Sequence, residues 1–142
     1  MSIVHHILPD ARVLDLCAGS GALGLEALSR GAASCDFVEK ATRSLAVIQA
    51  NLEALGGHDA AIVHRDDAVR FVEALAPGSF DVAFADPPYA TDVGRRLVAR
   101  WIEVPFAHVF GIEHPSSVTL PAPGKTRRYG RTALTFYHSD DP

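Results

Sequence analysis

The stretch "RVLDLCAGSGALGLEALSRG", residues 12–31, contains the unit from which the fold can be predicted. Its first five residues are mostly apolar, which predicts a short buried strand over 12–16. Residues 22–30 have helical spacing and are followed by Gly31, which favours the end of a helix. A G-x-G-x-x-G pattern joins the two, made by Gly19, Gly21 and Gly24. A strand that turns over glycines into a helix is typical of α/β proteins.

Strands and helices alternate over most of the remaining chain. The predicted strands cover 12–16, 35–39, 60–64, 80–85 and 108–114. The predicted helices cover 22–30, 42–55, a segment with Phe71, Val72 and Leu75, and 93–102. Residues 125–138 predict a closing hairpin with Gly130 near its turn. This alternation predicts an α/β fold in which a mostly parallel sheet carries helices on both faces.

Length and composition indicate one globular domain over 1–142. The chain has 142 residues, of which 48% are hydrophobic and 21% charged, and its formal net charge is −4. No apolar run is long enough to span a membrane, and two cysteines make no CxxC pair, so a cytoplasmic location is expected. The histidine spacings do not fit a zinc site, so no metal is expected. Basic residues nevertheless form two clusters: Arg95, Arg96 and Arg100, and Lys125, Arg127, Arg128 and Arg131.

Ligands of parallel sheets bind beyond the carboxyl ends of the strands, so the residues at these ends are the candidates for function. The glycines after the first strand let a backbone approach a ligand closely. Glu39 ends the second strand, where a carboxylate can accept hydrogen bonds from a ribose diol. Asp15 precedes the glycines and suits a cationic group better than a phosphate. Together they favour S-adenosylmethionine over a nicotinamide dinucleotide. The alternatives are a purely structural glycine turn and an Asp15 carboxylate that binds loop N–H groups.

Asp67 and Ala68 follow the third strand. The Asp67 side chain can accept a hydrogen bond from an adenine amino group, while the Ala68 N–H can donate to a ring nitrogen. The alternative for Asp67, as for Asp66, is to cap the helix that follows.

The stretch "ADPPYA", residues 85–90, follows the fourth strand. Pro87 and Pro88 stiffen the backbone, and the Asp86 carboxylate with the Pro87 carbonyl can form a fork of two acceptors for an exocyclic amino group. Tyr89 offers a ring on which a base can stack. These four residues are the predicted catalytic group. The alternative is a proline turn that ends a strand.

The segments "VLDLCAGSGALGLEALSRGAAS", "FVEK", "DDA", "ADPPY" and "YGRTALTFY" resemble the bacterial 16S rRNA guanine-N2 methyltransferases of the RsmD type, which are class I S-adenosylmethionine-dependent methyltransferases. The resemblance implies a Rossmann-like, seven-stranded sheet in the order 3-2-1-4-5-7-6 with the last strand antiparallel. It implies methylation of the N2 amino group of one guanine in 16S rRNA, on a small-subunit assembly particle, by a protein expected to be a monomer. Further residues within these motifs complete the expected cofactor site: Ala18, Ser20 and Lys40.

The beginning of the chain differs from this family. The segment "MSIVHHIL", residues 1–8, matches only the tail of the basic N-terminal region that family members use to hold RNA. We therefore expect the chain to bind S-adenosylmethionine but to methylate RNA poorly by itself. Two alternative functions stay open: an amino methylase with another target, such as adenine-N6 in DNA or RNA or a protein amide, and a truncated cofactor-binding domain with little activity alone.

Overall fold

The structure is a computed structural model that describes residues 6–56, 58–88 and 90–139. Its strands are β1 (Arg12–Leu16), β2 (Ser34–Glu39), β3 (Ala61–Arg65), β4 (Phe80–Ala85), β5 (Ala107–Pro115), β6 (Lys125–Tyr129) and β7 (Thr132–His138). Its helices are α1 (Ala22–Ser29), α2 (Thr42–Ala54), α3 (Ala68–Glu73) and α4 (Val93–Glu103). The predicted elements are all present, with ends that differ by a residue or two.

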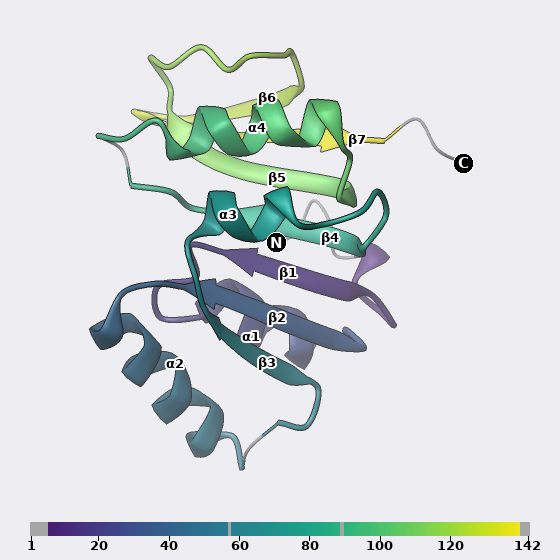
Figure 1. Cartoon of the computed structure of the whole chain (residues 1–142), viewed down its shortest axis with the longest axis vertical. Coiled ribbons are helices and arrows are strands. Elements are labelled where there is room, and N and C mark those ends of the chain that lie inside the picture. The colour runs from purple at the N-terminus through teal and green to yellow at the C-terminus, as the bar shows by residue number, and fades with distance from the viewer. Residues whose placement is uncertain (1–5, 57, 89, 140–142) are drawn as a thin grey trace.

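The strands of the described residues form one seven-stranded sheet in the order β3-β2-β1-β4-β5-β7-β6 (Figure 1). The predicted order is therefore confirmed. β1 through β5 pair in parallel, and β7 runs antiparallel to β5 and to β6. β1 lies between β2 and β4, so its carboxyl end meets those of both neighbours at one edge of the sheet.

Both faces of the sheet are covered by helices, as predicted. α3 and α4 pack on one face, where Val72, Leu97 and Val98 are buried against the sheet. α1 and α2 pack on the other face through Leu28 and Ile48. Figure 1 shows α3 and α4 in front of the sheet and α1 behind it. Leu75, expected in the third helix, lies beyond the end of α3 but still packs against the core on that face.

The C-terminal hairpin extends the sheet beyond β5. Gly130 has φ of 63° in the turn between β6 and β7, a backbone conformation that glycine adopts without strain. All five residues of β6 are exposed, so the basic side chains Lys125, Arg127 and Arg128 lie along an edge strand. No helix in the described ranges is long and apolar enough to cross a membrane.

Candidate functional site

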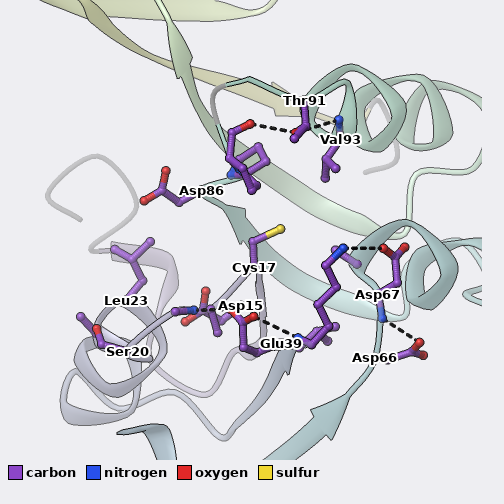
Figure 2. A pocket seen from close by; sticks show the side chains of 18 residues that line it. Asp15, Cys17, Ser20, Leu23, Glu39, Asp66, Asp67, Asp86, Thr91 and Val93 are labelled. Carbon is purple, nitrogen blue, oxygen red and sulfur yellow. Dashed lines mark hydrogen bonds and ion pairs between the residues drawn. The ribbon is translucent and has the colours of Figure 1, made fainter. Parts of the chain in front are cut away.

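A cavity of about 570 Å³ opens at the edge of the sheet where β1, β2 and β4 end (Figure 2). Its lining comes from the ends of four parallel strands and from the loops that follow them. The lining residues are Asp15, Cys17, Ala18, Gly19, Ser20, Ala22, Leu23, Val38, Glu39, Lys40, Asp66, Asp67, Ala68, Asp86, Pro87, Pro88, Thr91 and Val93. The fold therefore gathers most of the predicted site residues around one cavity.

The loop after β1 turns sharply through three residues with positive φ: Cys17 at 54°, Gly19 at 58° and Gly21 at 79°. Gly19 has nothing within 4 Å of where a Cβ would lie, so its backbone is open to the cavity. Ala18 and Ser20 also line the cavity. The turn thus presents backbone rather than bulky side chains to a ligand.

Gly21 and Gly24 do not line the cavity, although the glycine pattern suggested that they would contact the ligand. Gly21 is the residue before α1 and needs its positive φ. A Cβ on Gly24 would lie 2.3 Å from Phe37 Cε1 and 2.7 Å from Cys35 Sγ on β2. The last glycine of the pattern therefore lets α1 pack closely against the sheet.

Asp15 is 2% exposed and its Oδ2 accepts a hydrogen bond from the Gly24 N–H at 3.0 Å. Burial raises the pKa of Asp15 to about 7, against the lowering effect of the Gly24 hydrogen bond, and the charges of Asp86 and Glu39 raise it further. Asp15 thus has a structural role close to the predicted alternative, although the N–H that it binds belongs to the first turn of α1 and not to the loop. It also lines the cavity, where a ligand cation would stabilise its ionised form.

The Glu39 carboxylate connects the glycine turn to the start of α2. Its Oε1 accepts a hydrogen bond from the Gly19 N–H at 2.8 Å. Its Oε2 accepts from the N–H groups of Lys40 at 3.0 Å and Ala41 at 2.9 Å. A carboxylate offers about four lone-pair sites, so it can still accept a hydrogen bond from a ligand hydroxyl. Glu39 holds the turn in place whether or not a ribose is bound.

Asp67 caps α3, since its Oδ1 accepts a hydrogen bond from the Arg70 N–H at 3.0 Å. Its Oδ2 lies 3.8 Å from the Lys40 Nζ. Asp66 accepts from the Asp67 N–H at 2.8 Å. Both aspartates and Ala68 line the cavity. Asp67 therefore caps α3, as the alternative predicted. A hydrogen bond from an adenine would be an additional one that the Asp67 carboxylate accepts.

Asp86 is exposed at the end of β4, whereas Pro87 is buried and Pro88 exposed. The Pro88 carbonyl accepts hydrogen bonds from the Thr91 hydroxyl at 2.8 Å and the Thr91 N–H at 3.4 Å. No described N–H or hydroxyl donates to the Pro87 carbonyl. The Pro87 carbonyl therefore has no described donor that competes for its place in the predicted acceptor fork with Asp86, and Pro88 stiffens the turn into α4. Tyr89 lies outside the described residues.

Several residues near the site were not identified from the sequence. Cys17 lines the cavity, and burial raises the pKa of its thiol to about 12. Thr91 and Val93 follow the predicted catalytic stretch and line the cavity with it. Glu113 lies near the end of β5, beside Asp86 in the register of the sheet, and interaction with Asp86 raises the pKa of Glu113 to about 7. Inspection of the fifth strand end, like that of the first four, would have found it.

Acidic groups dominate the cavity. Five carboxyl side chains and a single ammonium line it: Asp15, Glu39, Asp66, Asp67, Asp86 and Lys40. This charge balance favours a ligand that carries a cationic group and hydroxyls, and it disfavours a pyrophosphate. No cluster of three or more possible metal ligands occurs within the described part of the chain.

The strand order, the glycine turn after β1 and the acidic residue at the end of β2 define a class I methyltransferase, the class that uses S-adenosylmethionine. One solved structure of similar fold is described as "Putative methyltransferase yhhF from Escherichia coli". It superposes with a TM-score of 0.82 at 28% identity, over 96% of this chain and 80% of that one.

The sequence comparison then gives the family. Residues 1–138 match the family described as "Conserved hypothetical protein 95", and the chain belongs to it. It is 35% identical over 137 residues to the Bacillus subtilis protein named "Putative rRNA methyltransferase YlbH". This match covers 89% of the chain and 74% of the Bacillus subtilis protein. The chain is 39% identical over 83 residues to the Escherichia coli "Ribosomal RNA small subunit methyltransferase D", which covers 58% of this chain and 41% of that protein.

Proposed function

We propose that the chain binds S-adenosylmethionine in the cavity at the ends of β1 to β4. The residues present fit this molecule: Asp15 for the α-ammonium, Glu39 for the ribose diol, and the turn at Gly19 for close backbone contact. Asp67 and Ala68 line the same cavity and would hold the adenine. The observation that carries the proposal is the charge of this cavity, since its carboxylates suit a ligand that has a cation and lacks phosphate.

The bound cofactor supplies a methyl group on a positively charged sulfur. The residues after β4 hold the group that receives the methyl. The Asp86 carboxylate and the Pro87 carbonyl each accept a hydrogen bond from one of the two N–H groups of a planar amino group. These two hydrogen bonds fix the direction of the nitrogen lone pair. Positioning of this kind can lower a barrier by about 7–11 kcal/mol. Tyr89 is proposed to stack on the base, as its place after the two prolines suggests.

We further propose that the acceptor is the N2 amino group of a guanine in 16S rRNA within a small-subunit assembly particle. The names of the Bacillus subtilis and Escherichia coli relatives support rRNA as the substrate class. The matched stretch spans less than half of the Escherichia coli protein, so the particular nucleotide does not carry over from it. Action as a monomer in the cytoplasm, where such particles assemble, is part of the same proposal.

Methyl transfer to unmethylated small subunits tests this function. Radiolabelled S-adenosylmethionine is incubated with the full chain and the particles, and the RNA is digested and its nucleosides are identified by mass spectrometry. We expect N2-methylguanosine. Asp86→Asn keeps the size of the side chain but replaces an acceptor oxygen by a donor, so turnover should fall by at least a hundredfold while cofactor affinity changes little.

The matched control is Asp92→Asn, which changes an exposed aspartate on the same loop and should leave turnover intact. N6-methyladenosine as the product would replace the guanine proposal by that of an adenine methylase. Cofactor binding without any transfer would favour a domain that needs a partner to act. Near-normal turnover by Asp86→Asn would contradict the acceptor fork.

A further inference from the structure

Glu113 lies beside Asp86 on the neighbouring strand. β4 and β5 are parallel, and Ala85, the last residue of β4, is paired with Ile112. The residues that follow this pair are Asp86, directly after β4, and Glu113 on β5. Ala85 and Ile112 both point into the core under α3 and α4. Because successive side chains of an extended chain alternate between faces, we infer that Asp86 and Glu113 both point to the opposite face. Phe84, two residues before Asp86, packs in the core on that opposite face.

The strand register brings the two carboxyl groups close to each other. A hydrogen bond to Asp86 is the largest cause that raises the pKa of Glu113 to about 7, followed by burial and by the charge of Asp86. Glu113 is half-buried, and Leu134 of β7 is its neighbour on the other side. Two carboxyl groups in contact repel each other once both are ionised, unless hydrogen-bond donors lie between or against them. The pair is therefore arranged to receive adjacent donors.

The Watson–Crick edge of guanine has the donors that such a pair requires. Its N1–H lies directly beside the N2 amino group. If Asp86 and Pro87 accept hydrogen bonds from the two amino N–H groups, the N1–H can donate a hydrogen bond to a further acceptor next to Asp86. Adenine and 2-aminopurine have a lone pair at N1 instead, which an ionised carboxylate repels.

We propose that Glu113 reads the N1–H of the target guanine and so selects this base over purines that lack the proton. This inference rests on the proposed function, because it assumes that Asp86 holds a guanine amino group. Sites built to accept a particular hydrogen bond discriminate strongly against analogues without the donor, since the buried acceptor is then left unpaired. Glu113 is thus a specificity residue that contacts the base, and no proton needs to be transferred to it.

Binding of three nucleosides tests the assignment. Guanosine, inosine and 2-aminopurine riboside are titrated by NMR into the full chain saturated with S-adenosylhomocysteine. Guanosine and inosine carry the N1–H, whereas 2-aminopurine riboside carries the amino group without it. We expect Glu113→Ala to weaken the binding of guanosine and inosine by about tenfold. The affinity for 2-aminopurine riboside should stay unchanged or rise. Glu113→Gln keeps an acceptor oxygen and should retain more of the guanosine affinity.

Glu53→Ala, an exposed change on α2, is the control and should alter none of the three. Equal weakening of all three nucleosides by Glu113→Ala, no weakening of any, or no guanosine binding to the unmodified protein would overturn the proposal. The result is separable from that of the methyl-transfer assay. A guanosine preference without methyl transfer would retain Glu113 as a base-reading residue and remove the enzymatic function. Methyl transfer to guanine, together with nucleoside affinities that Glu113→Ala does not change, would retain the enzymatic function and remove the base-reading role of Glu113.

Discussion

Two carboxylates, Asp15 and Glu39, bind backbone N–H groups of the glycine turn and of the first turn of α1 that follows it. Asp15 accepts from Gly24 at 3.0 Å and Glu39 from Gly19 at 2.8 Å. Loss of a side chain that orders the turn and also contacts a ligand has two effects. It removes a contact with the ligand, and it makes the backbone around the ligand less ordered. At the scale of single residues, this predicts substantial effects from small changes at either position.

We expect Glu39→Ala to weaken the binding of S-adenosylmethionine by at least tenfold. The variant removes an acceptor for the ribose and for three backbone N–H groups, and a hydrogen bond to a charged group contributes about 1.5–3 kcal/mol. Isothermal calorimetry measures the affinity, and circular dichroism checks the fold. Glu53→Ala is the matched control. Unchanged affinity in a folded Glu39→Ala protein would contradict the ribose assignment.

For Asp15 we expect opposite pH dependences of stability and binding. Its folded pKa of about 7 lies above the ordinary value of 3.8, so between these two values the folded protein binds a proton that the unfolded chain lacks. Stability of the unliganded protein therefore falls as pH rises through that window. A ligand ammonium favours the ionised carboxylate, so S-adenosylmethionine should bind more tightly as pH rises towards 7.

Thermal melting and calorimetry between pH 5 and 7.5 measure both trends, with Asp15→Asn as the comparison. Asn cannot ionise, so the variant should lose the pH dependence of stability that Asp15 contributes and should bind the cofactor weakly at every pH. Identical pH profiles for the two proteins would show that Asp15 is ionised throughout, or that its charge has no partner in the ligand.

At the scale of elements, the β1–turn–α1 unit depends on how closely the helix approaches the sheet. Only glycine fits at position 24, because a Cβ would lie 2.3 Å from the Phe37 ring. We expect Gly24→Ala to destabilise the protein by about 1–3 kcal/mol, as other insertions into packed cores do. It should also weaken cofactor binding, because the Gly24 N–H that orients Asp15 moves with the helix.

Urea denaturation measures this destabilisation, and Ser29→Ala, on the exposed side of the same helix, is the control. Alanine favours helices more than glycine by about 1 kcal/mol, so propensity alone predicts a gain. A more stable Gly24→Ala protein would therefore show that the sheet yields to the added methyl group and that close packing is not the reason for this glycine.

At the scale of the whole molecule, charge is segregated. The cavity is acidic, whereas basic side chains lie beside it and along β6. A hollow of about 390 Å³ adjoins the cavity, shares Pro87, Pro88 and Thr91 with it, and has Arg95 in its wall. Arg100, by contrast, bonds to Glu103 and to the Glu73 carbonyl. Of the first basic cluster, Arg95 is therefore best placed to contact a nucleic-acid phosphate near the base.

We expect Arg95→Ala to weaken binding of small-subunit rRNA and to reduce the slope of log affinity against log salt by about one, with cofactor affinity unchanged. Arg70→Ala, which removes an exposed arginine on α3, is the control. Filter binding at several salt concentrations measures the slope. An unaltered slope for Arg95→Ala would place the RNA backbone elsewhere, with β6 as the next region to test.

The sequence by itself determined the elements and the strand-end motifs, because both depend on residues close together in the chain. Apolar runs and helical periodicity located every strand and helix, and the glycine turn, Glu39 and "ADPPY" were recognisable as contiguous motifs at strand ends. Since parallel strands end at one edge of a sheet, these motifs were expected to meet, and the described ones line one cavity. The strand order came from resemblance to a family rather than from periodicity.

Only the tertiary structure decided how these residues are used. It assigned Gly24 to helix packing and one oxygen of Asp67 to the start of α3. It also brought Asp86 close to Glu113, a residue 27 positions away that no local motif marks. Register between strands, burial and the closeness of two like charges depend on the three-dimensional fold and not on residues that are neighbours in the sequence. The pKa of Asp15 is raised mainly by burial, and that of Glu113 mainly by its interaction with Asp86 and then by burial, so both shifts exist only once the sheet has formed.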